Sequence, residues 1–399
     1  MITTLVLTNG MRVIVAPNDK VPMVEVEIVY QFDPSSVPDG IPHLTEHLLF
    51  ETTANIANGD MDRWFRQAGG SSTASTNWDE IRIHDLISSA NLEWLVYIEA
   101  ERSLRLCQGV TAENLENQRQ VIANEMFSSA LQANGEVADR LRRKSFSLHP
   151  ALSKEVMGQI YDIENSSVED ICGFADQWLQ PTKATWIVSG DVEVERLQAL
   201  LLSYFPSEGV VSNSTMPIVE NEQHRWYTES DQQRLLLAFA APPTGSQAES
   251  ISDAIMYTLT QPQTWHELPH LNHIQGWSEN RDYGGLMVLS IETEHPQEAL
   301  ESLRQWLQEP SVNWSAWQDR QYLLSTRYME TNDGRVALLH SCVDHLPVAQ
   351  WENCFTWQQK RYLELPTSHS LEVALAYWNI EQASWLWMGP DNWLNGERF

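Results

Sequence analysis

The sequence has few basic residues and no long apolar run. Its 25 Lys and Arg residues stand against 54 Asp and Glu residues, which gives a net charge of −29. This charge repels phosphate backbones and anionic lipid, so nucleic acid and membrane surfaces are poor candidates for partners. The apolar run at residues 235–241 is far too short to span a bilayer. We therefore expect no nucleic-acid partner and no membrane association.

Cysteine is also scarce, and the chain shows no export signal. The four cysteines are scattered without a CxxC pair, at Cys107, Cys172, Cys342 and Cys354. This pattern is typical of free thiols in a reducing compartment. The first residues lack the basic segment of a secretory signal and soon reach a turn at Asn9-Gly10. Together these features predict a cytoplasmic protein with free thiols.

The remaining composition suits a folded chain of two domains. The length of 399 residues exceeds that of one ordinary domain, and the hydrophobic fraction of 42% supports a sizeable core. Asn9-Gly10 lies between two short apolar segments and predicts a β-hairpin. Residues 24–29 alternate apolar and acidic side chains, as a half-buried strand does. Later segments alternate helical periods with short strands, which predicts a mixed α and β fold.

Two stretches of the chain are repeated about half a chain length further on. Residues 184–191 (ATWIVSGD) are echoed by residues 383–391 (ASWLWMGPD), and residues 24–32 are loosely echoed by residues 234–241. A stretch rich in Pro, Ser, Asn and Glu separates the halves and has the composition of a linker. The repeats predict two related domains. The predicted boundaries are residues 1–208, a linker at 209–222, and residues 223–399.

The segment HLTEHLLF, which begins at His43, has the pattern of a metal-binding helix. At 100° per residue, His43, Glu46 and His47 lie on one stripe, and leucines cover much of the rest. Such a helix should be buried. A buried carboxylate beside two imidazoles is costly unless a cation accompanies them, and a divalent metal supplies that charge. Two histidines one turn apart suit zinc, and the glutamate can deprotonate a zinc-bound water.

A catalytic zinc site needs a third protein ligand, and Glu125 is the best candidate. Leu115, Gln118, Ile122 and Glu125 share one face of a predicted helix. Glu116 is about half a turn out of phase and should face solvent. The HxxEH motif alone also fits a helix with ordinary core histidines. The in-phase Glu125 favours the metal site.

Two other groups of metal-ligating residues are weaker candidates. His266-Glu-Leu-Pro-His270 matches the ordinary HExxH motif, but Pro269 would break the helix that must align the two histidines. The other group lies near the C-terminal third, where core packing is the simpler interpretation. Its members are His340, Cys342 and His345. Neither group predicts a second zinc site.

These motifs resemble the pitrilysin/insulinase (M16) family of zinc peptidases, and most closely its half-size group, which includes mitochondrial processing peptidase subunits. The family carries HxxEH and a glutamate on a second helix at a distance similar to the 78 residues between His47 and Glu125 here. Residues 40–50 and 69–76 resemble the family's metal helix and edge strand. The resemblance is strong over residues 1–208 and weak beyond.

The resemblance implies an α+β fold with two homologous domains, each a mainly antiparallel sheet with helices packed on one face. It implies one Zn²⁺ per chain with His43, His47 and Glu125 as ligands, and Glu46 as the catalytic base of a zinc metalloendopeptidase. Two half-size chains would enclose an unfolded peptide substrate. The peptide would add as a strand along an exposed sheet edge. The edge residues are Ser72, Thr73, Ala74 and Ser75.

Three departures from the family pattern bear on this expectation. Thr73 replaces the usual Asn of the edge strand, and Gln118 replaces a second Glu, so a supporting charge is missing. The family's substrate-binding Arg and Tyr would fall near Trp265 and Asn272, and neither fits. A heterodimer, in which a motif-less half-unit supplies that pair, is therefore favoured over a homodimer. The alternatives are a maturation peptidase for one precursor peptide and a non-cleaving binding subunit.

Overall fold

The computed structural model divides the chain into two compact units, each with its own hydrophobic core. The first unit comprises residues 1–136, 154–214 and 327–354, and the second comprises residues 137–153, 215–326 and 355–399. The structure describes residues 2–130, 135–146, 153–205, 225–228, 230, 233–281, 284–346, 348–389 and 397–398. The predicted linker at 209–222 lies outside the described residues. The units are not separated by a single cut in the sequence, because residues 327–354 cluster with the first half.

The first unit is built on a six-stranded sheet in the order β1-β2-β6-β3-β5-β4. Neighbouring strands run antiparallel, except that β2 and β6 are parallel. The turn between β1 and β2 contains Gly10 at φ +84°, a backbone conformation that favours glycine, so the hairpin expected at Asn9-Gly10 is present. The strands are β1 (Thr3–Val6), β2 (Arg12–Pro17), β3 (Met23–Gln31), β4 (Ser71–Thr76), β5 (Glu80–Ser88) and β6 (Ala184–Gly190).

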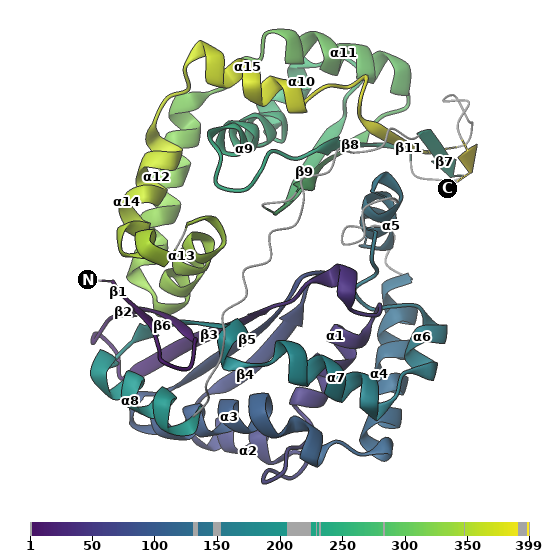
Figure 1. Ribbon diagram of the computed structural model, residues 1–399. Helices are drawn as coiled ribbons and strands as arrows, with labels where there is room; N and C mark the ends of the chain where they lie inside the picture. Colours follow the sequence, from purple (N-terminus) through teal and green to yellow (C-terminus); the bar gives the residue numbers. More distant parts are fainter. Residues whose placement is uncertain are drawn as a thin grey trace. The chain divides into compact units, whose positions relative to one another are not determined.

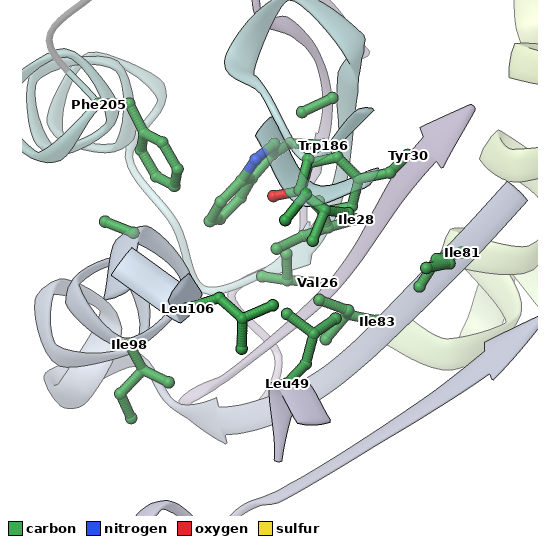
Figure 2. Close-up of a cluster of buried hydrophobic side chains, with 14 of the residues drawn as sticks. Val26, Ile28, Tyr30, Leu49, Ile81, Ile83, Ile98, Leu106, Trp186 and Phe205 are labelled. Atoms are coloured by element: carbon green, nitrogen blue, oxygen red, sulfur yellow. The ribbon is translucent and has the colours of Figure 1, made fainter. Parts of the chain in front are cut away.

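Helices pack on one face of this sheet and enclose the first core (Figure 1). Alternate residues of β3 point to this face, and Val26, Ile28 and Tyr30 are almost fully buried. Figure 2 shows these side chains grouped with Leu49 of α1 and Trp186 of β6. The helices are α1 (Ile41–Leu49), α2 (Asp60–Gln67), α3 (Leu92–Gly109), α4 (Ala112–Ala130), α6 (Ile160–Asn165), α7 (Val168–Trp178) and α8 (Val194–Tyr204), with 3-10 turns η1 (Pro34–Ser36), η2 (Ser89–Asn91) and η3 (Pro181–Lys183).

One helix from late in the sequence, α13 (Asn332–His345), lies against the other side of β3 and β6. Its residue His340 contacts Glu27, which alternates with the core residues Val26 and Ile28 and therefore points away from them. The short segment η4 (Val348–Asn353) follows α13. The sheet of the first unit is thus covered on both sides at its centre, with the main core on the side of α1.

The second unit repeats five of the six strands of the first sheet, and the edge strands β1 and β12 differ, because β1 is antiparallel to β2 whereas β12 is parallel to β7. Its order is β12-β7-β11-β8-β10-β9, and β7 and β11 are parallel, as β2 and β6 are. The repeated sequence segments fall on corresponding strands, β6 with β11 and β3 with β8. The fold class expected from the sequence is confirmed. The strands are β7 (Arg225–Thr228), β8 (Arg234–Ala240), β9 (His273–Arg281), β10 (Gly284–Glu292), β11 (Ser384–Met388) and β12 (Glu397–Arg398).

The helices of the second unit are α5 (Gly135–Ser145), α9 (Gln247–Leu259), α10 (Pro262–Glu267), α11 (Pro296–Gln308), α14 (Cys354–Leu363) and α15 (Ser368–Tyr377). Helix α12 (Trp314–Glu330) ends where the chain returns to the first unit. Alternate residues of β8, including Leu235, Leu237 and Phe239, are buried in the second core. None of the helices in the described ranges is long and apolar enough to cross a membrane.

The expectation of free thiols is wrong. Cys107 at the end of α3 is bonded to Cys172 of α7, with Cα atoms 5.5 Å apart. Cys342 of α13 is bonded to Cys354, with Cα atoms 5.6 Å apart. The sequence offers no CxxC motif because both pairs are formed by helices that meet only in the fold. The disulfides also weaken the argument for a reducing compartment.

Candidate metal centre

Helix α1 places both motif histidines on the same side. Gly40 precedes the helix with φ +77°, a conformation that favours glycine, and Pro42 occupies the first turn, where its missing N–H costs nothing. Leu44 and Leu48 are fully buried, which fixes the rotation of the helix against the core. The side chains of His43 and His47 remain 14% and 16% exposed. Both side chains therefore lie at the edge of the hydrophobic core, where solvent reaches them in part.

Helix α4 brings Glu125 to the two histidines. The Glu125 Oε2 atom lies 3.5 Å from His47 Nε2 and 3.9 Å from His43 Nε2. Ligands bound tetrahedrally at ~2.0–2.1 Å from zinc are about 3.3 Å apart, so these atoms are close to the required separation. The Glu125 side chain is 44% exposed, which leaves an open side for a water or a substrate. The three residues fit a catalytic zinc site.

The protonation state of His43 also suits a metal ligand. Burial, followed by the neighbouring charge of His47, lowers the pKa of His43 to about 4. The imidazole is therefore neutral at neutral pH, which is the form that binds a metal. Its Nδ1 atom is buried and has no hydrogen-bond partner among the described residues.

A second layer of polar residues orients His47. The Nδ1–H of His47 donates to the Gln118 Oε1 atom at 3.1 Å, and Gln118 Nε2 donates to the Glu51 Oε1 atom at 2.7 Å. This arrangement places the His47 proton on Nδ1 and leaves Nε2 free to face Glu125. The sequence suggested that Gln118 leaves the site without a supporting charge. The structure instead connects His47 through Gln118 to the carboxylate of Glu51, a residue that the motif did not single out.

Glu46, the expected base, is held by a residue that the sequence analysis also missed. The hydroxyl of Thr76, the last residue of β4, donates a hydrogen bond to the Glu46 carboxylate. Burial raises the pKa of Glu46, while the Thr76 hydrogen bond and the charge of His47 oppose that rise. A base needs a pKa closer to neutrality than that of a free carboxyl. The shift therefore has the direction that proton transfer requires.

The expected substrate-binding residues lie on β4, at the edge of the first sheet. Strand β4 pairs with β5 on one side, and no other described strand pairs with it. The hydroxyl of Ser72 accepts a hydrogen bond from the buried Arg102 guanidinium at 3.0 Å, which attaches the strand to α3. Thr73 and Ser75 are exposed, whereas Ala74 is half-buried. The strand thus presents a free edge next to Glu46.

The weaker candidate groups do not form a zinc site. Helix α10 ends at Glu267, and His270 has φ +67°, so His266 and His270 do not share a helix. Trp265 lies on α10 and Asn272 lies just before β9. These are the positions where the family pattern would have Arg and Tyr, and neither residue is of that type. Cys342 is bonded to Cys354 and cannot act as a free thiolate. The residue groups around His340 and His84 that the structure does assemble lie on the α13 side of the sheet.

Comparison with known proteins finds two curated relatives. The chain is 28% identical over 219 residues to zinc protease PqqE of Helicobacter pylori, a match that covers 54% of this chain and 49% of that protein. It is 23% identical over 244 residues to the probable zinc protease PqqL of Escherichia coli, covering 57% of this chain and 26% of that protein. The matched part therefore spans about half of the first relative and about a quarter of the second. No family model matches the chain.

Solved structures match nearly the whole chain. The periplasmic protease PqqL of E. coli superposes with a TM-score of 0.77 at 17% identity, covering 98% of this chain and 48% of that one. Solved structures of M16 proteins match as well, so the fold is that of the M16 peptidases, as the resemblance found from the sequence implies. An M16 inactive domain from Pseudomonas fluorescens superposes with a TM-score of 0.81 at 14% identity, covering 98% of both chains. The M16 fold therefore does not by itself establish activity.

Proposed function

We propose that the chain is a zinc metallopeptidase that hydrolyses peptide bonds with one Zn²⁺ bound by His43, His47 and Glu125. The observation that carries the proposal is the convergence of His43 Nε2, His47 Nε2 and Glu125 Oε2 beside Glu46. The M16 fold supports it, as does the similarity to two proteins named as zinc proteases. A non-cleaving subunit would need neither these three ligands nor a base next to them.

The chain's own residues account for the proton transfers of hydrolysis. Bound zinc would polarise the scissile carbonyl and lower the pKa of the attacking water. Glu46 would accept the proton of that water and deliver it to the leaving nitrogen, and Thr76 would hold its carboxylate in place. Gln118 and Glu51 would keep His47 in the tautomer that points Nε2 at the metal.

The substrate would be an unfolded peptide held along β4. A peptide that pairs with the free edge at Ser72, Thr73, Ala74 and Ser75 is bound mainly through its backbone, which suits a peptidase that accepts varied sequences. Because β4 ends at Thr76 and Thr76 contacts Glu46, a peptide on this edge runs directly to the proposed base. Enclosure of that peptide by a second half-size subunit remains part of the proposal.

A heterodimeric maturation peptidase is the second candidate. The described residues of the second unit contain no Arg and Tyr at the positions near Trp265 and Asn272 where the family pattern would have them. A partner half-unit that carries this pair would complete the substrate site. Similarity to an inactive M16 domain shows that half-units without activity exist in this fold. A complex that gains activity only on addition of such a partner would favour this candidate.

The compartment proposed from the structure differs from the cytoplasmic location expected from the sequence. Two disulfides, Cys107–Cys172 and Cys342–Cys354, suit an oxidising environment. One structurally similar protein is described as periplasmic. We therefore favour an oxidising compartment. Thiol labelling of the protein purified from its native source, with and without reductant, would test this. Label that is incorporated without reductant would show free thiols and would favour a reducing compartment instead.

The function itself is tested by peptide cleavage. The purified chain, loaded with zinc, is incubated with a mixture of unstructured peptides, and fragments are identified by mass spectrometry. Glu46→Gln is the matched control, because it keeps the size of the side chain and removes the base. Zinc-dependent fragments that appear only with the wild-type chain are the expected result. Equal cleavage by Glu46→Gln would contradict the assignment of the base.

A further inference from the structure

A buried group of charged side chains lies behind β4, on the helix side of the first sheet. Asp85 of β5 and Glu99 and Arg102 of α3 are each no more than 1% exposed. Arg102 Nη1 donates to the Glu99 carboxylate and lies 3.7 Å from Asp85 Oδ1. The mechanism above uses none of these groups. Apolar side chains of similar size would fill this space with a smaller cost of desolvation, so core packing does not explain the cluster.

Protonation of Glu99 makes the cluster neutral overall. Burial raises the pKa of Glu99 well above its ordinary value, and the charge of Asp85 raises it further, although the charge of Arg102 opposes the rise. Glu99 is therefore protonated at neutral pH, and the charge of Arg102 balances that of Asp85. The guanidinium is thus held in place without an excess of negative charge around it.

Strand β4 has no large apolar side chain with which to pack against the helices. Its sequence is SSTAST, and its inward side chains are those of Ser72, Ala74 and Thr76, which alternate with exposed residues. β4 is also an edge strand, so among the described strands only β5 pairs with it. The attachment of β4 to the helices therefore depends on the polar contacts of small side chains.

Hydrogen bonds attach both ends of β4 to the helices. At the end near the metal centre, the Thr76 hydroxyl donates to Glu46 of α1. At the other end, Ser72 Oγ accepts from Arg102 Nη1 at 3.0 Å. Ser72 lies directly opposite Asp85 in the pairing of β4 with β5. Arg102 therefore contacts both strands at the same position along the sheet.

Arg102 also contacts the end of the metal helix. Its guanidinium carbon lies 4.4 Å from the centre of the ring of Phe50, the residue that follows α1, and 5.8 Å from the centre of the Phe65 ring of α2. A cation is attracted to the face of an aromatic ring. Helices α1, α2 and α3 lie on the same side of the sheet (Figure 1). One side chain of α3 thus joins β4 to the helix that carries His43 and His47.

We propose that Arg102 is a positioning residue, which holds β4 at the distance from α1 at which a peptide paired with the strand reaches the metal centre. Arg102 is buried and acts through Ser72, so it touches neither the peptide nor the metal ligands. Arginine suits this role because its planar guanidinium donates to several partners in fixed directions. The inference rests on the proposed function, because it assigns β4 to the binding of the substrate.

Two single variants test the bond between Arg102 and Ser72. Arg102→Lys keeps a positive charge in the cluster but lacks the outer nitrogen that reaches Ser72, and Ser72→Ala removes the acceptor while the backbone of the strand is kept. Binding of fluorescein-labelled casein, an unfolded protein, is measured with zinc-loaded chains that also carry Glu46→Gln. We expect each variant to bind casein roughly tenfold more weakly, as loss of one hydrogen bond to a charged group predicts, with zinc content unchanged.

Two further measurements separate positioning from chemistry. In chains that keep Glu46, both variants should raise KM for casein cleavage and leave kcat nearly unchanged, because the metal centre itself is intact. Hydrogen exchange of the backbone amides at residues 71–76 should become faster in both variants, because the strand is attached to the helices at one end only. A loss confined to kcat, with unchanged exchange at β4, would overturn the inference.

The double variant shows whether Arg102 acts through Ser72. If it does, Ser72→Ala adds no further loss of casein binding to Arg102→Lys, whereas additive losses would contradict the inference. Ser103→Ala is the matched control, because Ser103 is buried beside Arg102 on α3 and donates to the Leu179 carbonyl instead of to β4. It should lower the unfolding temperature and leave casein binding unchanged. Equal weakening in Ser103→Ala and Arg102→Lys would indicate a general loss of stability and would overturn the inference.

The proposed function and this inference fail in different ways. A wild-type chain that cleaves neither casein nor any peptide would contradict the proposed function. Hydrogen exchange at β4 would still decide the role of Arg102, because it reports on the strand whether or not the chain is a peptidase. Unchanged exchange in both Arg102→Lys and Ser72→Ala would contradict the positioning role even in an active peptidase.

Discussion

Two clusters of histidine and carboxylate lie on opposite sides of the first sheet. One suits a metal ion, and the other suits a protonated histidine. In the metal centre, burial lowers the pKa of His43 to about 4, and the nearest carboxylate oxygen, that of Glu125, is 3.9 Å from Nε2. On the α13 side, burial also opposes the charge of His340. There, however, bonds to Asp344 and Glu27 outweigh burial and raise the pKa of His340 to about 9.

The difference indicates that residue type alone does not decide whether such a cluster suits a metal ion or a proton. Both clusters contain histidine and acid within metal-ligating distance of one another. At His340, Glu27 accepts a hydrogen bond from Nδ1 and Asp344 Oδ2 lies 3.1 Å from Nε2, so a protonated ring is paired with both acids and links α13 to β3. At His43 and His47, the ring nitrogens lie 3.9 and 3.5 Å from the Glu125 carboxylate, a spacing that suits the proposed metal ion between them. The following predictions test this contrast, from the largest effect to the smallest.

Removing a metal ligand should abolish zinc binding at the metal centre and nowhere else. Glu125→Ala deletes one of three ligands and leaves two imidazoles, so we expect no zinc to remain after dialysis against a weak chelator. His340→Ala is the matched variant in the other cluster and should retain one zinc per chain. Metal content measured by mass spectrometry checks both. Zinc retained by Glu125→Ala would place the third ligand elsewhere.

Because His340 is protonated in the folded protein, the free energy of unfolding should depend on pH. Its folded pKa of about 9 lies above the unfolded value of 6.5, so its contribution is full below pH 6.5 and is lost as the pH rises through 9. This shift in the pKa of His340 corresponds to a contribution on the order of 3 kcal/mol to the free energy of unfolding. Urea unfolding of wild type and His340→Gln at pH 6 and pH 9.5 measures it. A difference between the two proteins that stays constant with pH would contradict the charged bridge.

The hydrogen bonds that connect His47 through Gln118 to Glu51 should increase the affinity for zinc without being essential for binding. Gln118→Leu keeps most of the side-chain volume and removes both hydrogen bonds. We expect zinc affinity to fall by roughly 10- to 100-fold, with zinc still bound at saturating concentration. Competition with a fluorescent chelator measures the change. Gln118→Glu, which keeps the acceptor for His47 Nδ1 and loses only the donor to Glu51, is the control and should bind zinc more tightly than Gln118→Leu.

The smallest expected effect is that of Thr76. Thr76→Val removes the hydroxyl that donates to Glu46 while preserving the shape of the side chain. Because this bond favours the charged carboxylate, its loss should raise the pKa of Glu46 further. The acidic limb of the rate profile for peptide cleavage should therefore move to higher pH, with zinc content unchanged. A profile that superposes on that of wild type would show that Thr76 does not act on the base.

The sequence revealed those parts of this architecture that depend on local periodicity. His43, Glu46 and His47 share one helix, and Glu125 is in phase with the core face of α4, so helical geometry alone selects them. The repeat of residues 184–191 near the C-terminus similarly marks equivalent strands, β6 and β11. These features follow from spacing along one element, which a sequence displays directly.

The missed features depend on contacts between distant elements. Thr76 and Glu51 acquire their roles only because β4 and the end of α1 meet the metal centre. Cys107 and Cys172 are 65 residues apart, and no spacing rule pairs them. The acids beside His340 come from other strands and from a later turn of α13. Such groups become visible only when the fold brings them together.

X-ray diffraction at the zinc absorption edge would test the central claim most directly. A crystal of the chain purified with zinc, measured above and below that edge, locates the metal without any assumption about activity. The account predicts one anomalous peak per chain, within bonding distance of His43 Nε2, His47 Nε2 and a Glu125 carboxylate oxygen. A peak at the His340 cluster, or zinc bound without Glu125, would contradict it.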